Sequence, residues 1–220
     1  IFVALFMFAL FGVGISDVQG KNQQWEDRGI CRDLTLENIP LMGDDSIPMG
    51  EPQSNLSITQ EYNPEHGVYF NGKINYGHNG LDTVGGKEIK SLLKGVVILS
   101  REDSKTHGWG ETIMVATRPN PASEEIITIH YHHMKNVKTQ NTYWTSRQFQ
   151  ACNIVQSGDN IGEMGKTGSV TGAHLHTTIR RWANLAELKA TLESTSTLNA
   201  SNVQTLYGKA YASKGVTSHL

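Results

Sequence analysis

Histidine carries most of the chemistry that the residue types of this chain allow. The 220-residue sequence has nine histidines, and most of them lie in three short segments. In the first segment, His78 and Asp82 are four residues apart and can converge on one point if the backbone turns at Gly80. A neutral imidazole and a carboxylate oxygen are both ligands that zinc accepts. The spacing alone is weak evidence, because such a pair more often shares a hydrogen bond on a surface loop.

A second segment places two imidazoles side by side. The glycine-rich stretch Gly165–Gly172 runs into a strand-like sequence with histidines at 174 and 176. Residues two apart in a strand point to the same face, so His174 and His176 project together while Leu175 faces a core. The stretch does not lead into a helix, as a phosphate-binding loop does. The pair favours a metal or catalytic site, and the alternative of one packed and one solvated histidine stays open.

A third segment, Ile129–Met134, contains three histidines in another strand-like sequence. Strict alternation puts Tyr131 and His133 on one face of this strand and His130 and His132 on the other. Alternation alone does not say which face is functional.

The order of these segments resembles peptidase family M23, the zinc metallopeptidases of the lysostaphin and LytM type, which cut peptide cross-links in bacterial cell walls. The resemblance covers roughly residues 56–182. Its landmarks, in chain order, are His78–Asp82, Lys94–Val97, Gly108–Gly110, Tyr131–Met134, Val155–Gly162 and Gly168–His176. One such motif would be weak evidence, whereas the ordered set is strong.

The resemblance implies a role for each matching residue. It makes His78, Asp82 and His176 the ligands of a zinc ion. It makes His133 and His174 the two catalytic histidines that do not bind the metal, without saying which is the general base. The remaining histidines are interpreted as structural or surface residues: His66, His107, His130, His132 and His219. Three ligands leave the fourth zinc position open, which is typical of a catalytic site.

Two functions from different classes follow from the resemblance. The first is a zinc-dependent endopeptidase that hydrolyses peptide bonds in bacterial peptidoglycan stem peptides or cross-links. The alternative is a catalytically inactive LytM-like protein that binds the wall or activates another cell-wall hydrolase, a role that some relatives take after losing zinc ligands. The ligands and both accessory histidines are complete here, which favours the enzyme. A generic secreted β-sandwich with scattered histidines is a third, weaker interpretation.

The elements that must position these residues are mostly strands. The apolar runs are strand-length and rich in Val, Ile or Thr, and no sustained helical period appears between them. They are Leu56–Thr59, Gly95–Ser100, Thr112–Thr117, Ile126–Met134 and Leu175–Ile179. The pattern predicts a mostly β fold, an antiparallel sheet or sandwich, with one short C-terminal helix marked by leucines at 185, 188 and 192. The resemblance implies a lysostaphin-like, duplicated hybrid motif fold with a metal-containing groove.

The chain divides into four predicted regions. Residues 1–20 are expected to be a signal peptide or N-terminal anchor that is truncated at its start, and residues 21–55 a polar arm or linker. Residues 56–182 form the peptidase domain, and residues 183–220 a helix and tail. The apolar run at residues 1–15 has signal-peptide length and is shorter than the ~20 residues of a membrane-spanning helix, and a buried core helix is the remaining alternative. Export would place the domain in the periplasm or cell envelope, or outside the cell.

Charge and cysteine content limit the partners. The chain has 19 Lys and Arg against 21 Asp and Glu, a net charge of −2, so no basic surface suggests a nucleic acid partner. Peptidoglycan peptides are the expected partner, and membrane contact is expected only if the N-terminal run stays as an anchor. Cys31 and Cys152 fit a disulfide in an exported protein, and the sequence leaves open whether they pair.

Overall fold

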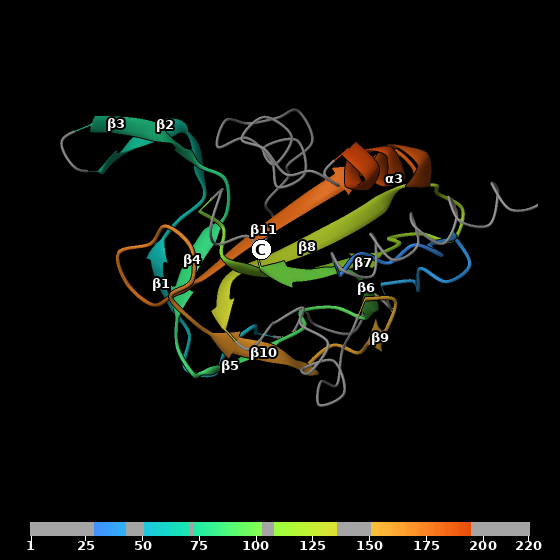
Figure 1. Ribbon diagram of the computed structural model, residues 1–220, viewed down its shortest axis with the longest axis horizontal. Helices are drawn as coiled ribbons and strands as arrows, with labels where there is room; N and C mark the ends of the chain where they lie inside the picture. The colour runs from blue at the N-terminus through green and yellow to red at the C-terminus, as the bar shows by residue number, and fades with distance from the viewer. Residues whose placement is uncertain (1–28, 43–50, 71–72, 103–107, 136–150, 195–220) are drawn as a thin grey trace, which may run out of the picture.

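Nine strands of the described residues join one antiparallel sheet (Figure 1). The computed structural model describes residues 29–42, 51–70, 73–102, 108–135 and 151–194. The sheet runs in the order β1-β4-β11-β8-β7-β6-β9, and β10 pairs with β5 and with β8. The strands are β1 (Ser57–Gln60), β4 (Leu81–Val84), β5 (Glu88–Lys90), β6 (Gly95–Glu102), β7 (Glu111–Thr117), β8 (Ile126–Lys135), β9 (Ile154–Val155), β10 (Asn160–Met164) and β11 (Leu175–Trp182).

The predicted fold class, mostly antiparallel β with one short helix, is confirmed. Each of the five predicted strands is present, and the leucine pattern forms the helix α3 (Leu185–Ser194). The Asn184 side-chain oxygen accepts a hydrogen bond of 2.9 Å from the backbone N–H of Glu187, which caps the first turn of the helix. Among the described residues, six further strands were not predicted. β5 and β9 have only three and two residues, too few for alternation to be recognised, and the longer β2 and β3, of eight and six residues, were also missed.

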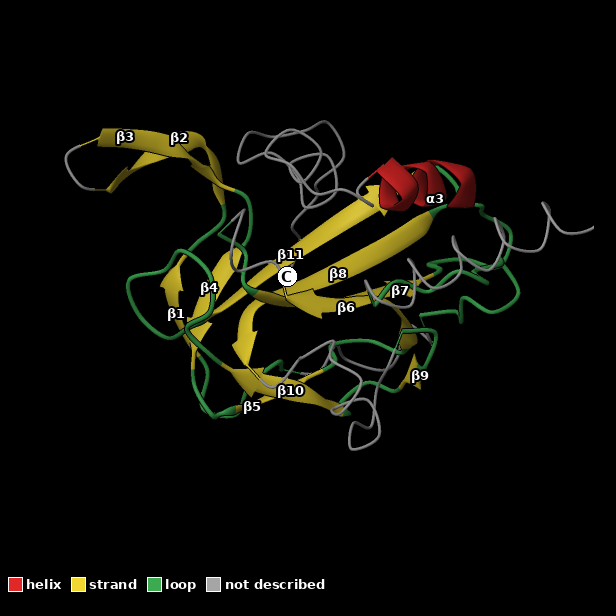
Figure 2. Cartoon of the chain, in the orientation of Figure 1, coloured by secondary structure: helices red, strands yellow, loops and turns green. Residues whose placement is uncertain are grey.

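A separate two-stranded sheet stands beside the main one. It consists of β2 (Asn63–Phe70) and β3 (Lys73–His78), and Figure 2 shows this hairpin projecting from the body of the molecule. The pairing of Asn63 with His78 closes the base of the hairpin. The last residue of β3 is therefore held where the hairpin meets the main sheet.

Two hydrophobic clusters lie on opposite faces of the main sheet. Along β7, Met114 and Ala116 belong to one cluster, and Ile113 and Val115 belong to the other, as strand alternation requires. The first cluster is covered by α3, which contributes Leu188 and Leu192. The second is covered by the segments around β5, β9 and β10, with buried residues Ile89, Leu92, Val155 and Ile161.

The segment at residues 29–42 also covers the first cluster, although the sequence analysis includes it in a polar arm. Its residues Ile30, Leu34 and Ile39 are buried in that cluster. Its backbone bonds to the sheet at both ends, through Cys31 N–H to the Ile98 carbonyl and Met42 N–H to the Arg118 carbonyl. This part of the predicted linker is thus part of the packed domain.

Several predictions fall partly or wholly outside the described residues. The predicted signal peptide or anchor at residues 1–20 does so, as does the predicted tail after residue 194. Within the described part of the chain, no helix is long and apolar enough to cross a membrane. The domain boundaries stay predictions.

A disulfide joins Cys31, in the segment at residues 29–42, to Cys152, which lies just before β9. The two residues are 121 positions apart in sequence. Close to each cysteine the backbone bonds to β6, through Cys31 N–H to Ile98 O at 2.9 Å and Cys152 N–H to Val97 O at 2.7 Å. The bridge thus closes a long loop across one strand of the main sheet.

We expect that the double substitution Cys31→Ser and Cys152→Ser lowers the free energy of unfolding. For a loop of 121 residues, the chain-entropy model gives a loss of about 5 kcal/mol, and native disulfides contribute about 2–5 kcal/mol. Denaturant unfolding monitored by circular dichroism measures the loss. A decrease below about 1 kcal/mol would show that the N-terminal segment is held by packing alone.

Candidate metal centre

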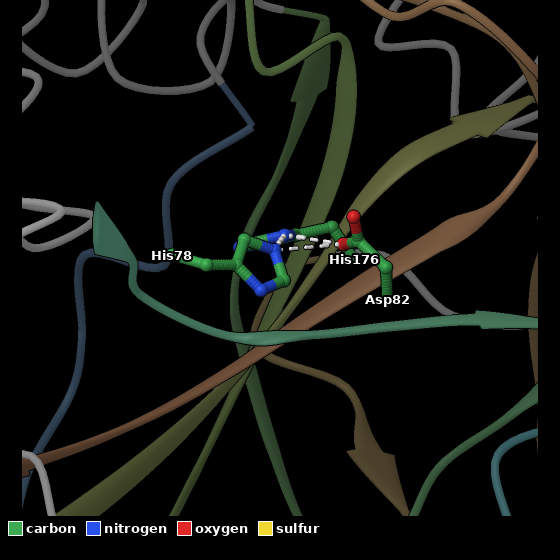
Figure 3. A group of neighbouring side chains, drawn as sticks. All are labelled: His78, Asp82 and His176. Carbon is green, nitrogen blue, oxygen red and sulfur yellow. Dashed lines mark hydrogen bonds and ion pairs between the residues drawn. The ribbon is translucent and has the colours of Figure 1, made fainter. Parts of the chain in front are cut away.

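Three side chains from three strands converge on one point (Figure 3). His78 ends β3, Asp82 lies in β4 and His176 lies in β11. The His176 Nδ1 atom is 2.7 Å from Asp82 Oδ1, and the His78 Nε2 atom is 3.1 Å from both Asp82 Oδ1 and His176 Nδ1. Asp82 and His176 are direct partners across β4 and β11. The register of β4 and β11 therefore brings Asp82 and His176 together, and His78 joins them from the end of β3, so the three residues predicted as metal ligands lie together.

The tautomer of His78 follows from its second nitrogen. His78 Nδ1 is 2.7 Å from the backbone carbonyl oxygen of Glu61. A carbonyl oxygen only accepts hydrogen bonds, so Nδ1 carries the proton and donates it. In the neutral ring, Nε2 then turns a lone pair toward Asp82 and His176. A backbone carbonyl that holds the outer nitrogen of a histidine is a common support of metal ligands.

The donor atoms fit a small metal ion that accepts nitrogen and oxygen. Zinc bonds of about 2.0–2.1 Å would set the ligand atoms of a tetrahedron about 3.3 Å apart. The three atoms here form a triangle with edges of 2.7 to 3.1 Å, slightly tighter than that. Two imidazole nitrogens and one carboxylate oxygen are also the ligand types that zinc prefers. Among the described residues the group has three donors, one fewer than a closed tetrahedral site requires.

Asp82 gives this cluster of donor atoms its negative charge. Burial opposes ionisation of Asp82 and is the largest single effect on its pKa. Hydrogen bonds and charge interactions with His176 and His78 together outweigh burial, so the pKa is lowered below its usual value. The carboxyl group is therefore ionised at neutral pH and contributes one negative charge to the point where the three donors meet.

His133 reaches the same region through an irregularity in β8. Both His132 and His133 lie opposite Thr112, since Tyr131 pairs with Ile113 and Met134 pairs with Glu111. His133 has a positive φ of 60°, the left-handed backbone of a G1-type β-bulge, a position where glycine is usual.

The sequence analysis placed His133 on the same face as Tyr131, and the structure corrects this assignment. Tyr131 and Met134 are both buried in the second cluster, so the strand alternation changes phase between them. The ring of His133 instead lies 5.9 Å from the ring of His176 and 4.8 Å from that of His174. The alternation rule fails because the bulge inserts one residue.

Backbone carbonyls orient His133 and His174 in the same way as His78. His133 Nδ1 donates to the carbonyl of Thr167 at 3.0 Å, and His174 Nδ1 donates to the carbonyl of Gly172 at 3.1 Å. Each ring is left with Nε2 for chemistry, and His174 Nε2 lies 3.6 Å from Asp82 Oδ2. The two residues that the sequence analysis assigned as catalytic thus flank the three donor atoms.

Burial keeps His133 uncharged. It lowers the pKa of His133 to about 3, with further contributions from the charges of His176 and His174. The ring is therefore neutral near pH 7, and its Nε2 has a free lone pair that can accept a proton.

Two glycine-containing loops interlock to build this side of the site. The backbone N–H of His133 donates to the Trp109 carbonyl at 3.0 Å, and Ser169 N–H donates to the Gly108 carbonyl at 2.9 Å. A Cβ atom on Gly168 would lie 2.7 Å from the backbone nitrogen of Gly110, so the two loops touch backbone to backbone. The glycines at these positions allow the contact that fixes His133.

His132 and Trp109 lie closer to the site than the sequence analysis expected. His132 is fully buried and is the cross-strand partner of His176, with ring centroids 5.6 Å apart. The Trp109 ring lies 4.5 Å from His132 and 5.4 Å from His176. Thr112 Oγ1 lies 2.9 Å from His132 Nδ1 and holds that ring in place. The signal in the sequence that could have indicated this position of His132 was the alternation of β8, which puts His132 on the face opposite to Tyr131.

Comparison with known families identifies the chain. The model of peptidase family M23 matches residues 76–189, more than half of the sequence. The chain belongs to peptidase family M23. The match includes all three donor residues and both flanking histidines. No sequence among the curated proteins matches this M23 chain.

Three solved structures that the chain resembles share little sequence identity with it. A zinc containing peptidase from Vibrio cholerae is 22% identical over 64% of this chain, with a TM-score of 0.42, and the chain spans only 35% of that protein. The catalytic domain of the antimicrobial peptidase lysostaphin from Staphylococcus simulans is 22% identical, with 59% and 82% of the two chains covered and a TM-score of 0.41. A putative peptidase M23 from Pseudomonas aeruginosa is 17% identical over 76% and 57%, with a TM-score of 0.41.

We expect Gly80→Ala to weaken zinc binding. A Cβ atom at Gly80 would lie 2.6 Å from His176 Nε2 and 2.5 Å from the Thr177 carbonyl oxygen, so the His176 ring or the backbone must move. Isothermal titration with zinc chloride measures the change, which should exceed tenfold if one ligand is displaced.

Gly158→Ala is the matched control for this substitution. Gly158 has a φ of 87° and no atom within 4 Å of its Cβ position, so alanine there adds backbone strain without touching the donors. Such strain costs about 1–2 kcal/mol. The control should lose stability and keep zinc affinity. Equal zinc affinity in the two variants would contradict the role of Gly80.

Proposed function

We propose that the protein is a zinc-dependent endopeptidase that hydrolyses peptide bonds in bacterial peptidoglycan stem peptides or cross-links. The convergence of His78, Asp82 and His176, with His133 and His174 beside them, is the observation that carries the proposal. Membership of the M23 family supports peptide hydrolysis. The inactive, wall-binding alternative is less well supported because no member of the expected residue set is missing.

The three donor residues would hold the zinc ion through His78 Nε2, Asp82 Oδ1 and His176 Nδ1. When bound at such a site, zinc polarises a carbonyl group and lowers the pKa of a bound water to about 7. The ionised Asp82 offsets part of the ion's charge. Burial also lowers the pKa of His176, which keeps this ring neutral and able to act as a ligand.

His133 and His174 are placed to move protons and stabilise charge. Both hold Nδ1–H on a backbone carbonyl, which fixes each ring; His174 presents Nε2 near Asp82, and the ring of His133 lies 4.8 Å from that of His174. A neutral Nε2 accepts a proton from the attacking water and can return it to the leaving amine. A protonated ring stabilises the oxyanion that forms on the scissile carbonyl. The two roles fall to this pair, one histidine for each.

The wall peptide as substrate and the export of the protein are parts of the same proposal. A disulfide that closes a loop of 121 residues is typical of proteins that fold outside the reducing cytosol. The net charge of −2 provides little attraction for an anionic wall polymer, so recognition would depend on contacts near the site. An exported location, in the periplasm or cell envelope or outside the cell, fits these features.

We expect His78→Ala to abolish both zinc binding and wall hydrolysis. The substitution removes one of three ligands. Alanine cannot supply the Nε2 lone pair that the hydrogen bond from His78 Nδ1 to the Glu61 carbonyl orients. Mass spectrometry of muropeptides released from purified sacculi, with and without a chelator, measures the activity and names the bond that is cut. Arg181→Ala, which removes an exposed ion pair with Glu125, is the control and should keep both properties. Chelator-resistant release by the unsubstituted protein would contradict a metal-dependent reaction.

We expect His174→Ala to retain zinc and lose turnover by about a hundredfold or more, in line with the contribution of general acid–base groups. His174 Nε2 is 3.6 Å from Asp82 Oδ2 and lies outside the group of three donor atoms. Zinc content by atomic absorption and muropeptide release are measured on the same sample. If zinc is lost together with activity, the roles of His174 and His176 are wrongly assigned.

A further inference from the structure

The nitrogen of His176 that faces away from the donor atoms, Nε2, contacts a side chain, whereas the corresponding nitrogen of His78, Nδ1, contacts the backbone. His176 Nε2 lies 3.1 Å from Thr178 Oγ1, whereas the outer nitrogen of His78 bonds to the Glu61 backbone. Both His176 and Thr178 are buried, on the same face of β11. The support of His176 therefore depends on one hydroxyl group, which a substitution can remove.

We propose that Thr178 is a positioning residue that holds the ring orientation of His176 and supports, by accepting a hydrogen bond from Nε2–H, the tautomer that binds the metal. The inference rests on the proposed function, in which Nδ1 of His176 binds zinc. A neutral imidazole has one protonated nitrogen, so a lone pair on Nδ1 requires the proton on Nε2. The Thr178 hydroxyl oxygen can accept a hydrogen bond from that N–H group and so supports the tautomer that binds zinc.

The hydroxyl also suits the metal-free protein. There, His176 Nδ1 lies 2.7 Å from the ionised Asp82 Oδ1 and can donate a proton to it, which leaves Nε2 as an acceptor. A threonine hydroxyl both donates and accepts, so Thr178 can turn its own proton toward Nε2 in this state. One side chain thus satisfies Nε2 in both tautomers, which a carbonyl or a carboxylate oxygen does not do.

Water cannot easily replace this contact. The His176 side chain is 6% exposed and its ring is packed against the rings of Trp109 and His132. A buried N–H group that loses its acceptor keeps the full cost of desolvation. Loss of the hydroxyl should therefore make the tautomer that binds zinc less favourable, in addition to leaving the orientation of the His176 ring less restrained.

Thr177 provides a matched control one residue away. It is also buried in β11 but points to the other face, opposite Tyr131. In the described part of the chain, its Oγ1 atom has no hydrogen-bond partner. Thr177→Val and Thr178→Val change the same atoms in the same strand, and only the second breaks a bond to His176.

The experiment compares the zinc affinities of Thr178→Val, Thr178→Ser and Thr177→Val by competition with a chromogenic chelator. We expect Thr178→Val to bind zinc about 10–100-fold more weakly, as is usual when a support of a metal ligand is removed. Thr178→Ser keeps the hydroxyl and should restore affinity to within a few-fold, and Thr177→Val should leave it unchanged. Thermal unfolding of the metal-free variants shows whether any loss reflects the fold.

A second measurement separates positioning from packing. A long-range ¹H–¹⁵N spectrum of the zinc-loaded protein should show His176 protonated at Nε2, and metal-free Thr178→Val should show a changed tautomer ratio for this ring. Wild-type affinity in Thr178→Val, or equal losses in the serine and valine variants, would overturn the role of Thr178. Failure of the unsubstituted protein to bind zinc would instead overturn the proposed function.

Discussion

The register of three neighbouring strands is the constraint on which the site depends. Asp82 of β4 pairs with His176 of β11, and His176 pairs with His132 of β8. A slip of one residue would turn every side chain of a strand to the other face. The buried Leu175 and Tyr131 on the opposite face resist that slip, since it would expose them. The alternation of apolar residues that builds the core thus also directs the polar residues of these strands to the site.

The backbone supplies most of the orientation around the site. The carbonyl groups of Glu61, Thr167 and Gly172 each accept a hydrogen bond from Nδ1–H of one histidine, and His78 and His174 present Nε2 to Asp82. These carbonyls lie in loops and turns between strands, where they are not committed to the sheet. Glycines allow those loops to approach each other closely. The chemistry of the histidines is set largely by main-chain geometry, and the side chain of Thr178 is the exception.

Much of the strand content was predictable from the sequence, because period-two patterns do not depend on distant contacts. The resemblance to the M23 family named the five candidate site residues, which the structure brings close together, and their roles stay predictions. The packing of residues 29–42 was not, since Leu34 and Ile39 are isolated apolar residues in a polar stretch and show no period. The bulge at His133 was missed because alternation assumes an unbroken strand. The bond from His176 to Thr178 depends on side-chain rotamers, which no spacing reveals.

The bulge in β8 has a consequence for how this strand tolerates change in length. Side chains of a strand alternate between its two faces, and the extra residue changes the phase of this alternation between Tyr131 and Met134. Deleting one residue there would restore a uniform frame, leaving a single histidine opposite Thr112 while the core contacts of Tyr131 and Met134 stayed in place. Such a deletion would preserve the fold and empty one side of the site, so the length of this segment is as much a functional property as its composition.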